Sequence, residues 1–407
     1  MLRTLHRIVT PLVAALLVFG CDSERDDPVS EVAASEEAQR ELLDLAYASA
    51  SRFPVDPHIK NRSRSQQAVV EAALAAGDLE RAVAYARGIE NWRRGLSLAM
   101  VAYSHAAAGR RDAALALLTE AEEDLLGNSA DENAQKWRAD RVRSWIASTW
   151  FALGDEDKRQ EYGADLESSE LERISLEEGR RLGTEALGEY LGGVDLVLDK
   201  GDHERVRAVL AALTELHRRF YPDESLRGAI ATRVDAAERQ VARDLYVDAM
   251  LRMAQGASEA GDQDAAAAYV RRAQDYCDAG RWDADDGAIL RSRLAIGWSR
   301  AGRVDLARKI LDAASAEFDA REEELFDMFR ASPLRSLAEG YLHAGELEKA
   351  ADHYARAVEA GALNPNSRPR AIDLADTLCS MVLNGYRPTD SLRERMTEIS
   401  DGLGNPW

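Results

Sequence analysis

The chain has 407 residues, a formal net charge of −20, and 46% hydrophobic residues with 6% aromatic. This hydrophobic content favours a folded chain and argues against wholesale disorder. The negative charge disfavours binding to nucleic acid and anionic lipid, because both need lysine or arginine to replace their counterions. We interpret the charge as a solvated acidic surface.

Residues 1–20 have the composition of a signal peptide. Basic residues precede an apolar run from Pro11 to Phe19, which is too short to span a bilayer comfortably. The residues VFGC, ending at Cys21, resemble the lipobox of bacterial lipoproteins. The resemblance implies cleavage before Cys21, its lipidation and stable anchoring in the cell envelope, facing the periplasm. Asp22 resembles a signal for retention in the inner membrane. The alternative is an ordinary signal peptide or an uncleaved anchor, in which Cys21 is incidental.

Two short regions follow before the main body of the chain. Residues 21–36 are polar, acidic and interrupted by Pro28, which predicts a flexible tether. The segment SEEAQRELLDLAYASASRF predicts a helix, and we assign residues 37–64 to an N-terminal cap.

A repeated pattern runs through residues 65–362. A glycine followed by a polar or charged residue recurs between two helical stretches, and in five copies an alanine stands five residues after that glycine. A left-handed glycine ends the first helix, and a small residue lets the second helix pack closely against it. The turn glycines are Gly77, Gly109, Gly154, Gly201, Gly261, Gly302 and Gly345, and the alanines are Ala82, Ala114, Ala266, Ala307 and Ala350.

The copy around Gly345 resembles the tetratricopeptide repeat. The residues that match the family's pattern are, in order, Leu334, Leu337, Ala338, Tyr341, Gly345, Ala350, Tyr354 and Ala357. The copies at Gly154 and Gly201 are degenerate, with Arg159 and Val206 in place of the alanine. After the first, which is 32 residues, the glycine spacings exceed the family's period of about 34 residues, so longer or inserted helices are expected, chiefly in EEDLLGNSADENAQKWRAD and RRFYPDESLRGAIATRVDAAERQ.

Residues 363–407 predict two further helices, AIDLADTLCSMVLNGY and TDSLRERMTEIS, that close the other end of the stack. No strand-like alternation persists, so the fold class is all-α: one continuous α-solenoid of stacked antiparallel helix hairpins.

No motif predicts catalysis, a metal site or a cofactor. The seven histidines lack a second metal-ligand type at helical spacing, and each is interpreted as a surface or groove residue. The segment GASEAG closes a helix where a nucleophile elbow needs a strand, and GTEALGEYLGG lacks the lysine of a phosphate loop. The acid runs EED, DADD and REEE are interpreted as solvated surface.

Two of the cysteines and two of the tryptophans are interpreted as structural residues. Cys277 and Cys379 are predicted to be buried, unpaired thiols. Trp92 and Trp137 each stand seventeen residues before a turn glycine and are followed by arginine. Packing between repeats is favoured for both, and exposure would make them binding anchors.

The resemblance implies that the first helices of the repeats line a concave groove for partner proteins. We therefore expect a noncatalytic, membrane-tethered scaffold whose partner is not named by the sequence. The alternatives are an envelope enzyme with a site assembled from distant residues, and a structural spacer without a specific ligand. The predicted groove residues are Tyr103, Arg141, Ser144, Ser148, Phe151, Asp195, Gln255, Ser258, Ser292, Ser299, Arg335, Glu339 and His343.

Overall fold

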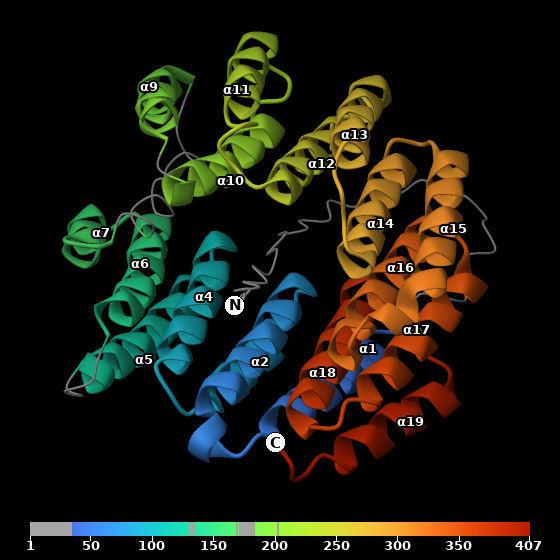
Figure 1. The fold of residues 1–407 in the computed structure, drawn as a ribbon. Helices are drawn as coiled ribbons and strands as arrows, with labels where there is room; N and C mark the ends of the chain where they lie inside the picture. The colour runs from blue at the N-terminus through green and yellow to red at the C-terminus, as the bar shows by residue number, and fades with distance from the viewer. Residues whose placement is uncertain (1–34, 130–134, 168–169, 171–183, 202) are drawn as a thin grey trace. The chain divides into compact units, whose positions relative to one another are not determined.

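The computed structural model describes residues 35–129, 135–167, 170, 184–201 and 203–407. These residues form α-helices and two short 3₁₀-helices, with no extended β-strand among them (Figure 1). The signal peptide, Cys21, Asp22 and most of the expected tether lie outside the described residues. The all-α fold class predicted from the sequence is confirmed.

The chain divides into two compact units. The first comprises residues up to Asn128 together with Asn366–Trp407, and the second comprises Ser129–Pro365. The sequence predicted one continuous solenoid, so this division is a difference from expectation.

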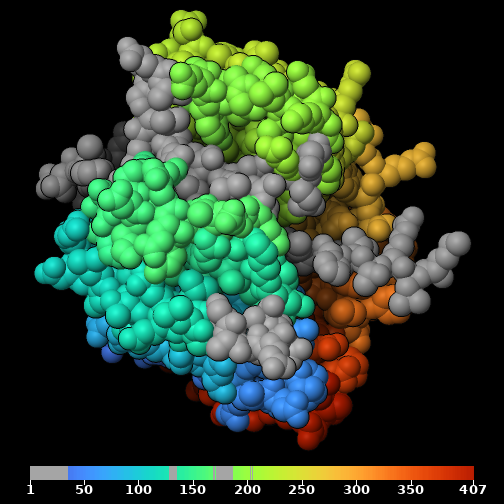
Figure 2. All heavy atoms as spheres, turned by 90° about the vertical axis from the view of Figure 1, so that its left-hand side faces the viewer, coloured from blue at the N-terminus to red at the C-terminus, as the bar shows by residue number. Residues whose placement is uncertain are grey.

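The first unit contains seven helices from the two ends of the described chain. They are α1 (Glu36–Ser51), α2 (Val55–Ala75), α3 (Leu79–Arg87), α4 (Arg93–Ala107), α5 (Arg111–Ser129), α18 (Ser367–Leu383) and α19 (Asp390–Asp401). Helix α18 packs against both α1 and α2. Figure 2 shows blue N-terminal residues and red C-terminal residues of this unit side by side. The expectation that the two terminal regions close opposite ends of a stack is therefore wrong, because they pack on each other.

Polar and aromatic contacts join the ends of the chain within the first unit. The hydroxyl of Ser49 donates to that of Ser400 at 2.8 Å, and Arg52 pairs with Asp401 at 2.6 Å. The centre of the Trp407 ring lies 5.2 Å from that of the fully buried Phe53. These contacts span about 350 residues of sequence.

The second unit contains the remaining helices. They are α6 (Lys136–Leu153), α7 (Glu156–Gly163), α9 (Thr184–Lys200), α10 (His203–Arg219), α11 (Glu224–Ala236), α12 (Arg243–Glu259), α13 (Gln263–Asp278), α14 (Ala284–Arg300), α15 (Val304–Arg321), α16 (Ala331–His343) and α17 (Leu347–Ala362). The pairs α12/α13, α14/α15 and α16/α17 are antiparallel hairpins with extensive contact. The longer helix and the inserted helix that the glycine spacings predicted are both present: α5 extends to Ser129, and α11 is the inserted helix.

The turn glycines have the backbone that the repeat pattern predicts. All seven have positive φ, and Gly385, which the sequence analysis did not single out, makes the same turn between α18 and α19. At Gly345 the glycine N–H donates to Leu342 and the next N–H donates to the Tyr341 carbonyl at 2.9 Å. This six-to-one bond defines a Schellman cap, which satisfies carbonyls at the helix end.

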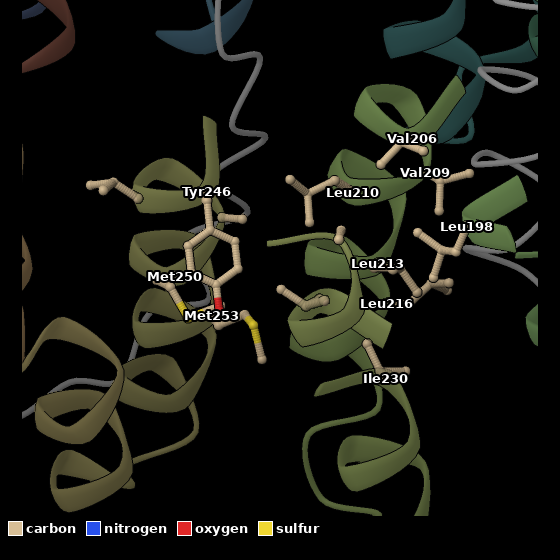
Figure 3. Packing of buried hydrophobic residues seen from close by; sticks show 14 of the residues in the cluster. Leu198, Val206, Val209, Leu210, Leu213, Leu216, Ile230, Tyr246, Met250 and Met253 are labelled. Atoms are coloured by element: carbon tan, nitrogen blue, oxygen red, sulfur yellow. The ribbon is translucent and has the colours of Figure 1, made fainter. Parts of the chain in front are cut away.

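The core is built from the apolar faces of these hairpins. The five predicted alanines are fully buried, as is Val206 at the degenerate Gly201 copy. Leucine and valine side chains of α10 meet Tyr246, Met250 and Met253 of α12, with Leu198 of α9 and Ile230 of α11 in the same cluster (Figure 3). Cys277 is buried in this cluster, Cys379 is buried in α18, and neither is in a disulfide, as predicted.

Candidate binding surface

The first helices of the last three hairpins, α12, α14 and α16, form a contiguous row. Helix α14 packs closely against both α12 and α16, whereas α15 and α17 are joined through longer side chains, as in the Arg356–Asp319 pair at 2.6 Å. Helices whose backbones pack more closely on one side than on the other make a curved array, with the closely packed row inside. We call the solvent-facing side of α12, α14 and α16 the first-helix surface.

Each of these first helices has a second glycine, five residues before the turn glycine, at a close contact with a neighbouring helix. A Cβ at Gly256 would lie 3.0 Å from the backbone Cα of Arg218 on α10, and one at Gly340 would lie 2.5 Å from Leu311. Gly297 meets Leu251 in the same way at 2.8 Å. The segment GASEAG, considered above as a catalytic motif, thus contains a helix-crossing glycine and a turn glycine.

Three of the predicted groove residues are not on any surface. Ser144, Ser148 and Ser292 are fully buried. Ser292 donates to the Ala288 carbonyl at 2.8 Å and Ser148 to the Ser144 carbonyl at 3.0 Å. A serine can satisfy its hydroxyl on the carbonyl one turn earlier in its own helix, so a polar residue on a helix face need not be exposed. Their assignment to the groove is wrong.

Gln255 and Ser258 come together on the first-helix surface. Arg300 of α14 donates to the side-chain oxygen of Gln255 at 3.0 Å, and Ser258 donates to the Arg300 carbonyl at 2.7 Å. Ser299 is partly buried beside this contact on α14. The remaining first-helix candidates, Arg335, Glu339 and His343, are on α16, where Arg335 and Glu339 are half-buried and His343 is exposed.

The other candidates lie away from these three helices. Arg141 on α6 pairs with Glu170 at 2.9 Å, and Glu170 also accepts from the buried Ser144. Phe151 is half-buried near the Arg159 guanidinium, and Asp195 of α9 pairs with Arg233 of α11 at 2.7 Å. Tyr103 is on α4 in the first unit. The predicted groove is therefore reduced to the residues of α12, α14 and α16.

Arginines that the sequence analysis missed dominate the same surface. Arg252 and Arg293 occupy equivalent positions, nine residues before Gly261 and Gly302, and Arg300 follows on α14. Arg293 pairs with Asp248 at 3.0 Å across the α12–α14 contact. Burial lowers the pKa of both Arg252 and Arg300, although both guanidiniums stay charged at neutral pH. The recurrence of arginine at one repeat position is the sequence signal that could have identified them.

Two histidines are buried, which corrects their interpretation as surface or groove residues. His217 is fully buried, with its Nε2 3.0 Å from the Tyr269 hydroxyl. His353 has its Nδ1 2.8 Å from the Lys349 carbonyl and its Nε2 3.0 Å from the Ser315 hydroxyl. Desolvation by burial lowers the pKa of each, to about 4 for His217. The Ser315–His353 contact links the buried sides of α15 and α17.

The two tryptophans have different environments. Trp92 is buried, as packing between repeats predicts, and the guanidinium carbon of Arg93 lies 4.6 Å from the centre of its ring. Trp137 remains 39% exposed, and its indole N–H donates to Gln135 at 2.9 Å.

The described residues offer neither a metal-binding cluster nor a membrane-spanning helix. No three histidine, cysteine or carboxylate side chains there are placed to hold a metal ion. None of the helices described is both long and apolar enough to cross a membrane.

The helices, their left-handed glycine turns and their stacked hairpins define an all-helical repeat protein. No known protein family model matches the chain, and no curated protein matches it either. One solved structure, a "circular tandem repeat protein with novel repeat topology and enhanced subunit contact surfaces", is 17% identical over 90% of this chain and 96% of its own. Its TM-score is 0.27, so the fold assignment here depends on the chain's own helices and turns.

Proposed function

We propose that the protein is a noncatalytic scaffold that binds partner proteins on the first-helix surface of α12, α14 and α16. The observation that carries the proposal is the contiguous row of these three helices, in which α14 packs against both α12 and α16. Stacked helix pairs commonly bind partners on such an inner surface.

The side chains on this surface favour a polar partner segment. Arg300, Gln255 and Ser258 supply donors and acceptors at the α12–α14 contact, while Arg335, Glu339 and His343 extend the set along α16. Arg293 and Asp248 add an ion pair that holds α12 against α14. Few side chains there are apolar, so specificity would come from hydrogen bonds and charge.

We also propose that the repeats are tetratricopeptide-like. Leu334, Leu337, Ala338, Tyr341, Ala350 and Tyr354 are all buried at the α16/α17 hairpin, as that family's packing requires. The Gly154 copy departs from the pattern at Arg159, so the proposal is strongest for the last three hairpins.

We further propose that Cys21 is lipidated and tethers the protein to a bacterial cell-envelope membrane, with Asp22 favouring the inner one. The residues VFGC carry this proposal. Mass spectrometry of the N-terminal peptide from the native protein and from Cys21→Ser tests it. An acylated cysteine at the N-terminus of the native protein supports the tether, and an unmodified one overturns it.

A charge swap tests the binding surface. In Arg335→Glu/Glu339→Lys the net charge is unchanged, and in the control Asp305→Lys/Lys309→Glu the same exchange is made on exposed residues of α15. The proteins that bind the first-helix surface are captured by crosslinking in intact cells and then identified. They should be absent with the α16 swap and present with the α15 swap.

If the α16 swap unfolds the protein, a second variant, His343→Glu, tests the same surface. His343 is exposed at the end of the helix, so its replacement should leave the fold intact. Thermal melting of each variant identifies any that unfold. Equal partner recovery from all folded variants would show that the first-helix surface is not the binding surface.

A further inference from the structure

The connection between α15 and α16 presents two apolar side chains to solvent. Phe326, which lies between the 3₁₀-helices η2 (Glu322–Glu324) and η3 (Asp327–Phe329), is 78% exposed, and Met328 within η3 is 55% exposed. Leu325 points the other way and packs against the core. We call the pair Phe326 and Met328 the apolar knob. Exposed large apolar residues close together in the chain commonly mark interaction sites.

The knob is held in place by its own connection. Arg330 donates to the Leu325 carbonyl from Nε at 3.1 Å and from Nη2 at 2.9 Å. The Phe329 N–H donates to the Phe326 carbonyl at 2.9 Å, and Arg356 of α17 pairs with Glu322 at 3.3 Å. Because the backbone is already fixed on both sides, a partner would not have to order this segment on binding.

The surroundings of the knob are acidic. Between Arg321 and Arg330 the chain has four carboxylates, which face these two arginines and Arg356 of α17, an excess of one negative charge. Glu324 pairs with Arg321 at 3.2 Å and Asp327 with Arg330 at 3.5 Å. Glu323 is exposed with no ion-pair partner among the described residues. The acid run REEE, interpreted from sequence as plain solvated surface, thus borders an exposed apolar pair.

We propose that the apolar knob binds a basic amphipathic helix of a partner protein. Phe326 and Met328 would fill a hole between side chains of the helix's apolar stripe, as a side chain fills a hole on a facing helix. Lysine or arginine beside that stripe would pair with Glu323, the carboxylate of this connection that is not already in an ion pair. A second copy of this chain is disfavoured by its charge of −20, and an anionic lipid surface is disfavoured by the carboxylates of this connection.

A defined peptide tests the proposal with the full-length protein. The probe is a fluorescent amphipathic helical peptide of leucine and lysine, and the reference is a peptide in which serine replaces every leucine. The protein should bind the leucine/lysine peptide more tightly than the reference. Phe326→Ser/Met328→Ser should weaken binding of the leucine/lysine peptide at least about tenfold, as loss of interface anchors does. Binding of the reference should not change.

Two controls separate the knob from general effects. Leu126→Ser removes an apolar side chain that is 73% exposed on α5 and should leave Kd unchanged. The α16 charge swap should also leave it unchanged, so the knob and the first-helix surface can fail independently. Equal Kd values for the wild type and the knob variant would overturn the proposal. Self-association, or binding to phosphatidylcholine vesicles, that is lost only in the knob variant would also overturn it, in favour of those occupants.

Discussion

His217 is a buried, titratable residue in an aromatic cluster. Its ring meets those of Tyr221 and Tyr269 edge-on at 5.3 Å each, and its Nδ1 is buried without a hydrogen-bond partner among the described residues. The nearby charge of Arg227 adds to desolvation in lowering the pKa of His217 to about 4. The imidazole is therefore neutral in the folded protein at pH values where an unfolded chain would protonate it.

This difference predicts acid sensitivity. The unfolded chain binds a proton near pH 6.5 and the folded chain only near pH 4, so the free energy of unfolding should fall as the pH decreases between these values. The loss should be on the order of 3 kcal/mol at pH 4. Urea unfolding at several pH values checks it. In His217→Gln, which cannot titrate, the pH slope should be smaller, and an unchanged slope would show that His217 does not contribute.

Gly385 shows what one turn residue contributes. Its φ is +62°, and the following N–H, from Tyr386, donates to the Met381 carbonyl at 2.8 Å. Gly385→Ala should lower the free energy of unfolding by about 1–2 kcal/mol, because a Cβ is disfavoured in the left-handed region. Gly127→Ala is the matched control within a helix and should be neutral or slightly stabilising. Chemical denaturation of both variants tests the difference, and equal effects would contradict it.

Among the elements, the sequence predicted best what is local. A turn glycine and the alanine five residues later act within one hairpin, so all seven turns and all five buried alanines were correctly predicted. Gly385 was missed because its hairpin was treated as a cap rather than as another copy. The buried serines were missed because hydrogen bonds to their own helices hide their polarity.

Partners of helices were harder to predict than helices. An apolar stripe predicts that a face is buried but does not name the helix that covers it. The packing of α1 on α18, the division into two units and the outward position of the apolar knob all depend on such pairings. Of the predicted groove residues, three are buried serines and four others lie on α4, α6 and α9, so the predicted set was wider than the surface proposed here.

The close contact of α12 with α10 at Gly256 should make this position intolerant of a larger residue. A valine there would press its side chain against the backbone of α10 at Arg218, which cannot move as a flexible side chain end could. Gly256→Val should cost about 1–3 kcal/mol of stability, as overpacking does elsewhere. Gly228→Val on α11, where no atom lies within 4 Å of an added Cβ, should cost less. Thermal melting compares them, and an equal loss would contradict close packing as the cause.

At the scale of the whole molecule, the contact between Phe53 and Trp407 joins the two ends of the first unit. Trp407→Ala should lower the stability of that unit by about 1–3 kcal/mol, less than for a fully buried tryptophan because Trp407 is only half-buried. Hydrogen exchange should become faster in α1 (Glu36–Ser51) while α12 in the second unit keeps its protection. Exchange that rises equally in both helices would contradict a local role for the contact.

The pairing of α1 and α2 with α18 also sets an order of events during synthesis. A ribosome completes α1 more than 300 residues before α18, so the apolar side of α1 lacks its native cover while the rest of the chain is made. Contacts this distant in sequence form slowly, whereas the hairpins of the second unit need only neighbouring residues. We therefore expect the second unit to fold first, and the N-terminal helices to be the stretch of nascent chain that most needs a chaperone.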